Sequence, residues 1–182
     1  MNEGDHARFR ELEPAQLGLI LNRWKEPHRR WHGLHHLGAL LRCIEADPDL
    51  SESDREMLGY VALFHDAVYA PLKQDNEEES ARLAMDYLPN YSRRDEVVET
   101  ILATKTHHAE NLLAKKFNVW DCAILREKDW QKLLEYEKGI AFEYREVEPE
   151  TYRRERSRFL KKAARDFDNP LLVQLANGVA HG

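Results

Sequence analysis

Apolar residues recur at helical spacing along nearly the whole chain, and this periodicity limits what the chain can fold into. No stretch alternates polar and apolar residues as a half-buried strand does, and no internal repeat or linker interrupts the pattern. The sequence therefore predicts an all-α fold, a single-domain helical bundle that spans residues 1–182. Helices are expected at 14–25, at about 29–46, after the cap-like 51–54, from near Asp75, after the cap-like 92–95, and at about 129–147 and 150–166, with one more turn in the tail from Asn169.

The composition limits the classes of partner. The formal net charge of −6 gives no whole-molecule attraction to nucleic acid or to an anionic membrane, although it leaves room for a local basic pocket. The N-terminal segment "MNEGDHARFR" lacks the apolar core of a signal peptide, and no apolar run is long enough to cross a membrane. Cys43 and Cys122 stand far apart without a CxxC motif, which is typical of reduced thiols. We expect a cytoplasmic protein with neither a nucleic acid polymer nor a membrane as partner.

One apolar run, "LFHDAVY" at 63–69, contains two ionisable residues, His65 and Asp66. Burying both costs several kcal/mol unless they are hydrogen-bonded, paired or bound to a metal ion. Taken alone, this dipeptide has a second interpretation, in which a helix ends there, His65 bonds to the backbone and Asp66 is exposed.

Histidines are also concentrated in "HRRWHGLHHL". His32 and His36 are four residues apart and would share one helix face, which His28 extends if the helix reaches back so far. Two histidines at this spacing can bind one metal ion. A histidine beside aromatic residues is nevertheless more often a core or surface residue than a metal ligand, so the spacing by itself leaves both interpretations open.

The order of the histidine and aspartate motifs along the chain favours the metal-site interpretation. A histidine comes first, then His65-Asp66 in an apolar helix, then Asp121 in the apolar "VWDCAIL". This order resembles the H…HD…D pattern of the HD superfamily of metal-dependent phosphohydrolases, and more closely a subgroup of small, uncharacterised predicted HD hydrolases. The motifs that carry the resemblance are "PHRRWHGLHH", "HDAVY", "DNEEESA", "ILATKTH" and "DCAIL", and it spans about residues 24–160.

The resemblance implies a metal site and a set of roles within an HD-type bundle. The implied metal ligands are His36, His65, Asp66 and Asp121. The implied catalytic residues are Asp66 and Glu77, with Glu77 as general base or water-positioning group. A second metal ion or a substrate phosphate would be held by residues among His32, His107, Arg29 and Asn76. Two of these have simpler interpretations: Glu77 belongs to an acidic first turn that favours a helix through its dipole, and Arg29 would cover a helix end.

The chain departs from the subgroup at three places. Val119 stands where the family usually has an extra aspartate, and Trp31 stands where it has a tyrosine. Ala141 replaces an arginine in "IAFEY", which removes a phosphate contact that relatives of this subgroup would make. The four implied metal ligands are unaffected by these changes, whereas the implied substrate contact at Ala141 is lost.

Two or more histidines with two carboxylates suit Mn²⁺, Fe²⁺, Co²⁺, Ni²⁺ or Zn²⁺ and tolerate Mg²⁺ less well. A divalent ion with open positions activates water and polarises a phosphoryl oxygen. With this chemistry available, the resemblance to the HD superfamily implies a metal-dependent phosphohydrolase that acts on a small phosphoester, with nucleotides as the leading class because the superfamily favours phosphoesters. Two alternatives stay open: a non-catalytic nucleotide-binding or sensor domain, and a di-iron oxygenase-like enzyme that recruits His32, Glu77 and His107 as further ligands.

Overall fold

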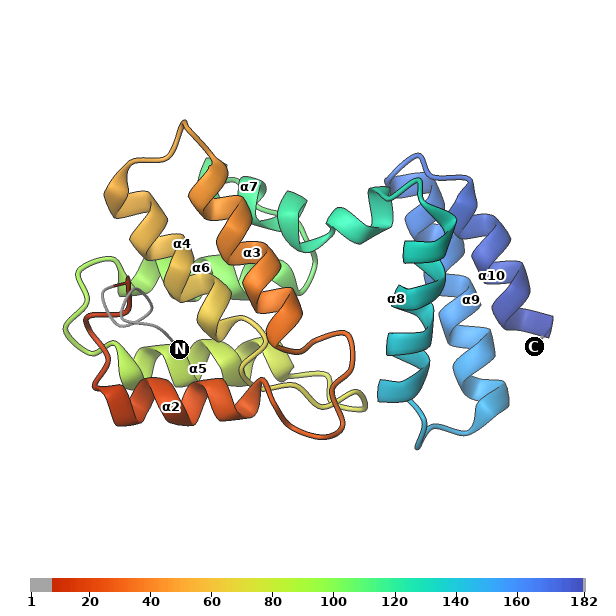
Figure 1. Cartoon of the computed structure of the whole chain (residues 1–182), viewed down its shortest axis with the longest axis horizontal. Helices are drawn as coiled ribbons and strands as arrows, with labels where there is room; N and C mark the ends of the chain where they lie inside the picture. The colour runs from red at the N-terminus through yellow and green to blue at the C-terminus, as the bar shows by residue number, and fades with distance from the viewer. Residues whose placement is uncertain (1–7, 182) are drawn as a thin grey trace. The chain divides into compact units, whose positions relative to one another are not determined.

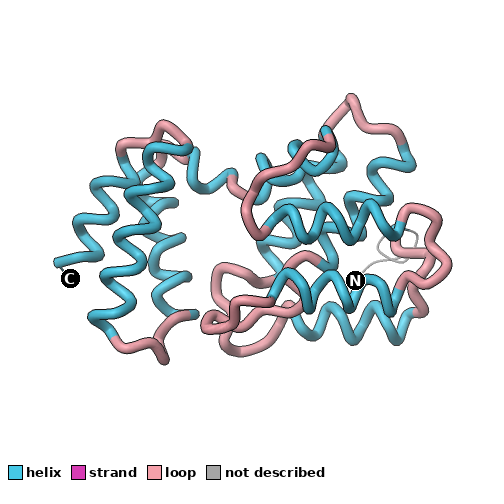
Figure 2. Tube along the Cα trace, turned by 180° about the vertical axis from the view of Figure 1, so that it is seen from behind, coloured by secondary structure: helices cyan, strands magenta, loops and turns pink. Residues whose placement is uncertain are grey.

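The computed structural model describes residues 8–181, and within that range every regular element is a helix and none is a strand (Figures 1 and 2). This confirms the predicted all-α fold class. The chain forms two compact units. The first unit comprises the described residues up to Pro27 together with His32–Asp121, and the second comprises His28–Trp31 and the residues from Cys122 onward. A single domain over 1–182 stays a prediction, and the two units are described separately.

Helix α4 is the central element of the first unit. Its residues from Met57 to Phe64 are all buried, so its last two turns have no solvent-exposed face. Each of the other helices of this unit contacts α4, which places the carboxyl end of α4 in the middle of the bundle. The helices are α2 (Pro14–Arg23), α3 (Leu34–Ala46), α4 (Glu52–Phe64), α5 (Asn76–Tyr87), α6 (Arg94–Thr104) and α7 (Leu112–Asp121) (Figure 1).

The helix starts predicted at 14, near Asp75, at about 129 and at 150 agree with the structure to within one residue. Of the remaining three, one agrees and two differ. The cap predicted at 51–54 is confirmed, because Asp54 donates its backbone N–H to the Ser51 hydroxyl at 3.1 Å and closes a capping box. The helix predicted from about residue 29 begins only at Leu34, after an extended Gly33. His32 therefore lies outside the helix, so the prediction that it shares a helix face with His36 is wrong, and His28 does not extend that face. The cap predicted at 92–95 is also wrong in detail, because α6 follows Arg93 without a side-chain cap.

The second unit is a smaller helical bundle. Its elements are a 3-10 turn at Ala123–Arg126 followed by α8 (Trp130–Glu143), α9 (Pro149–Asp166) and α10 (Leu171–His181). The predicted single turn in the tail is instead the full helix α10, because Leu172, Leu175 and Ala176 bury an apolar stripe.

The segment His28–Trp31 belongs to the second unit through its contacts with α8. The Trp31 ring lies edge-on to Tyr136 with centroids 4.8 Å apart. The buried carboxylate of Glu143 accepts the backbone N–H groups of Arg30 and Trp31 at 2.7 and 2.6 Å. A carboxylate that satisfies two backbone donors holds this short non-helical segment in place.

The remaining fold-level predictions concern the thiols, the membrane and the N-terminus. Cys43 and Cys122 are free thiols, as predicted. None of the helices found in residues 8–181 has the length and apolarity that a bilayer crossing requires. Residues 1–7, which hold most of the segment predicted not to be a signal peptide, lie outside the described residues.

Candidate metal centre

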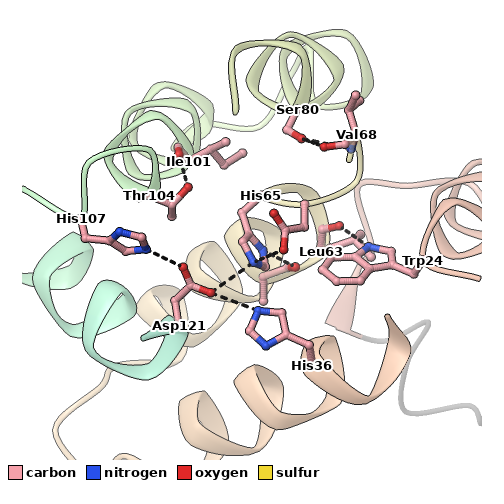
Figure 3. Close-up of polar contacts among 12 residues, drawn as sticks. Trp24, His36, Leu63, His65, Val68, Ser80, Ile101, Thr104, His107 and Asp121 are labelled. Atoms are coloured by element: carbon pink, nitrogen blue, oxygen red, sulfur yellow. Dashed lines mark hydrogen bonds and ion pairs between the residues drawn. The ribbon is translucent and has the colours of Figure 1, made fainter. Parts of the chain in front are cut away.

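Three helices of the first unit bring His36, His65 and Asp121 together (Figure 3), and the Asp66 carboxylate lies beside His65. His36 lies in the first turn of α3, His65 and Asp66 follow α4, and Asp121 ends α7. One Asp121 oxygen, Oδ1, lies 3.0 Å from His36 Nε2 and 3.6 Å from His65 Nε2. The Asp66 carboxylate lies 3.4 Å from His65 Nε2. Residues separated by up to 85 positions in sequence therefore converge on one point.

The orientation of the His65 ring indicates what this point can bind. His65 Nδ1 lies 3.0 Å from the carbonyl oxygen of Ala62. A carbonyl oxygen only accepts, so Nδ1 must carry a proton. Nε2 then points between two carboxylates, is buried, and has no hydrogen bond of acceptable geometry within the described residues. Nε2 needs either a proton or a metal cation there, and an imidazole held by a backbone carbonyl at Nδ1 is the usual arrangement of a metal-bound histidine.

The ionised carboxylates of the cluster also favour the binding of a cation. Burial raises the pKa of Asp121, but the hydrogen bonds with His107 and His36 and the nearby His65 imidazole lower that pKa by more, so the net pKa is well below the usual value. Burial likewise raises the pKa of Asp66, and attraction by His65 outweighs that effect, so Asp66 is also ionised. For His65 burial lowers the pKa, while Asp66 and Asp121 raise it above the usual value. Two carboxylates held ionised at the carboxyl ends of α4 and α7 make a site at which a divalent ion can replace the imidazolium proton.

His107 contacts the second oxygen of the same carboxylate. Its Nε2 lies 3.2 Å from Asp121 Oδ2, while Oδ1 faces His36 and His65. The backbone of His107 has a φ of 55°, in the left-handed region that non-glycine residues seldom adopt. Such strain costs roughly 1–3 kcal/mol and is found mostly at functional sites. The two oxygens of Asp121 thus face different imidazoles, His107 on one side and His36 with His65 on the other.

Aromatic rings close one side of the centre. The Trp24 ring lies 5.5 Å from that of His65, and the Phe117 ring lies 5.3 Å from it. Trp24 is held in turn by a hydrogen bond from its indole N–H to the Leu63 carbonyl at 2.9 Å. These rings lower the local polarity, which strengthens every electrostatic interaction at His65. The sequence did not single out Trp24 or Phe117, because an aromatic residue in an apolar helix carries no signal of its neighbours.

The other residues implied by the resemblance have different surroundings. The His32 ring stacks on Tyr69 with centroids 4.5 Å apart and lies 6.0 Å from the His36 ring, so it borders the centre. The Asn76 side-chain amide exchanges two hydrogen bonds of 3.0 Å with the backbone of Ala70, which clamps the loop before α5. A role for Asn76 at a metal or phosphate stays a prediction.

For Glu77 and Arg29 the structure gives the element and the burial, but no contact with the cluster. Glu77 is a half-buried residue in the first turn of α5, and no contact within the described residues joins it to the cluster. Arg29 is buried in the second unit, with 8% of its surface exposed. Their roles as general base and phosphate contact stay predictions.

A scan against protein-family models, a search of curated proteins and a search of solved structures found no match for this chain. The resemblance to the HD superfamily therefore depends on the sequence motifs, and membership stays a prediction. What stands independently of it is a buried cluster of imidazole and carboxylate groups on three helices, with the donor set that transition-metal ions prefer.

Proposed function

We propose that the first unit is a metal-dependent phosphohydrolase that acts on a small phosphoester, with nucleotides as the leading substrate class. The observation that carries the proposal is the convergence of His36, His65 and Asp121 around a buried imidazole nitrogen that lacks a hydrogen-bond partner within residues 8–181. The reaction class comes from the H…HD…D order of these residues. Fold and donor set alone would not name the substrate.

In this proposal His36, His65, Asp66 and Asp121 hold the metal ion. The ion would supply polarisation of a phosphoryl oxygen and a lowered pKa of water. The Ala62 carbonyl keeps the His65 proton on Nδ1, so that Nε2 stays available toward the centre. The buried rings of Trp24 and Phe117 pack against the His65 imidazole and keep its surroundings apolar.

His107 and Glu77 complete the proposed chemistry. The contact of His107 with Asp121 Oδ2 favours a second ion or a substrate phosphate at this position. Glu77 accepts the proton of the attacking water, or orients that water, from the first turn of α5. A positioned base of this kind typically contributes about 10²- to 10⁴-fold to the rate.

Replacement of Glu77 tests the catalytic assignment. Glu77→Gln keeps the size of the side chain and removes its basicity, so we expect metal content to be unchanged and turnover to fall by about 10²- to 10⁴-fold. The assay is hydrolysis of a panel of nucleotides and other phosphoesters by purified protein with Mn²⁺, Co²⁺, Ni²⁺, Fe²⁺, Zn²⁺ or Mg²⁺.

The matched control is Glu79→Gln, in the same turn. Glu79 pairs with the exposed Arg82 at the surface, so its loss should leave turnover unchanged. Full activity in Glu77→Gln would show that another group takes the proton. Tight nucleotide binding by a metal-loaded protein that hydrolyses no phosphoester would favour the sensor alternative.

A further inference from the structure

One face of α9 in the second unit carries a row of basic side chains. Positions four apart on a helix share a face, and Arg153, Lys161 and Arg165 are related in this way through Ser157. They line a groove of about 740 Å³ that reaches Ala180 of α10, which packs beside α9 (Figure 1). We call it the α9 groove; its charged lining consists of Glu150, Arg153, Arg154, Arg158, Lys161 and Arg165.

The cations of this groove are little used in holding the fold. Within residues 8–181 no ion pair joins Arg153, Lys161 or Arg165 to a carboxylate. Arg154 and Arg158 share the exposed Glu155, at 2.8 and 3.4 Å. Exposed pairs of this kind contribute little to stability. These cations therefore remain available to a ligand.

Arg156, on the same helix, is by contrast paired with a carboxylate and shielded from solvent. Its Nε lies 2.9 Å from the Glu137 carboxylate, and only 9% of its side chain is exposed. Its guanidinium also covers the Tyr136 and Phe159 rings. Arg156 is thus shielded from solvent and paired, whereas Arg154, Arg158 and Arg165 of the α9 groove are exposed and Arg153 is half-buried.

The net charge of the whole chain differs in sign from that of the unit that contains this groove. The formal net charge is −6, but the second unit contains 14 arginines and lysines against 11 aspartates and glutamates. Such an asymmetry between parts of a chain is typical of proteins that bind polyanions with one part. Glu150 is the one acidic residue in the described lining of the groove, and it lies in the first turn of α9. Beyond this first turn, the charged residues of the described lining are all basic.

We propose that the α9 groove binds a linear chain of phosphate groups, such as the backbone of a single-stranded nucleic acid. Cations four residues apart are spaced by about 6 Å along the helix axis, and the row from Arg153 to Arg165 covers about 18 Å. This spacing is comparable to that of successive phosphates in an extended strand. Guanidinium forks bind phosphate oxygens in pairs, and the buried Ser157 adds a hydroxyl to the lining.

The lining also favours phosphates over other anionic partners. It contains no aromatic residue on which bases would stack, so binding is expected to be independent of base sequence. Its one apolar residue is the small Ala180, which offers nothing to insert into a lipid surface. A row of cations in a groove fits a linear chain better than a flat bilayer.

The test is the binding of a fluorescently labelled oligothymidylate by the full chain, measured by anisotropy at several salt concentrations with EDTA present. EDTA makes the result independent of the proposed metal centre. The triple variant Arg153→Gln, Lys161→Gln, Arg165→Gln should bind at least tenfold more weakly at low salt, with a salt dependence smaller by about 2 in logarithmic slope. Glu150→Gln should tighten binding, because it removes the opposing charge.

The control for position is Lys162→Gln, which removes one positive charge from α9 outside the groove lining and is compared with the single variant Lys161→Gln inside it. Unchanged binding by this control, together with displacement of the oligothymidylate by inorganic polyphosphate, would support the proposal. Wild-type affinity in the triple variant would overturn it, as would equal losses in the triple variant and the control. Failure of polyphosphate to displace the strand would exclude phosphate recognition. Binding to phosphatidylserine vesicles alone would assign the groove to a membrane surface instead.

Discussion

Asp121→Ala is expected to abolish tight binding of divalent transition ions by this protein. Asp121 is the residue on which the centre converges, since one of its oxygens faces His36 and His65 and the other faces His107. Loss of a residue that merely orients a ligand typically costs about 10- to 100-fold in metal affinity. Removal of a charged ligand shared by three imidazoles should cost more. The measurement is metal content after dialysis, together with calorimetric titration by Mn²⁺, Co²⁺, Ni²⁺ and Zn²⁺.

The thermal unfolding midpoint gives a second measurement that does not depend on activity. A ligand that binds only the folded state stabilises it, by about 2.7 kcal/mol at a hundredfold excess over Kd. Metal should therefore raise the unfolding midpoint of the wild type but not that of Asp121→Ala, and Asp66→Ala should behave like the latter. Asp95→Ala is the matched control, because Asp95 is 84% exposed at the start of α6. Equal metal content in the wild type and Asp121→Ala would remove Asp121 from the metal site.

The helices were predictable because the sequence determines them locally. Apolar periodicity and the capping box of Ser51 and Asp54 need only neighbouring residues. The convergence of His36, His65 and Asp121 was anticipated only through the order of the motifs, since no local rule states which helix ends meet. The sequence thus predicted the members of the cluster better than their surroundings.

Other features depend on packing between distant segments, and the sequence carries little signal of them. The late start of α3 after Gly33 leaves Arg29 in a segment that Glu143 holds in the second unit. The segment "KTHHAE" contains no sequence signal that predicts the positive φ of His107. From the motif, Asn76 was predicted to face a metal ion or a phosphate. In the structure, its side-chain amide forms two hydrogen bonds with the backbone of Ala70. Each case is decided by a partner that lies outside the local pattern.

The second large effect is expected from Arg156→Ala, which should destabilise the second unit by about 3–5 kcal/mol. Glu137 accepts a hydrogen bond from the Tyr152 hydroxyl at 2.6 Å as well as the one from Arg156, and 11% of its side chain is exposed. Without Arg156 this carboxylate stays buried and loses its counter-charge, and the Tyr136 and Phe159 rings lose the guanidinium that covers them. The measurement is urea unfolding, with hydrogen exchange of α8 and α9 to locate the loss.

Two further variants separate the cost of an unpaired charge from the cost of a lost side chain. Arg158→Ala removes an arginine that is 77% exposed from the same helix and should change stability by less than about 0.5 kcal/mol. Arg156→Met combined with Glu137→Leu removes both charges and keeps most of the buried volume, so it should recover much of the stability that Arg156→Ala loses. If Arg156→Ala unfolds at the same urea concentration as Arg158→Ala, the buried pair contributes no more than a surface pair. If the double variant is no more stable than Arg156→Ala, the loss comes from packing rather than from the unpaired Glu137 carboxylate.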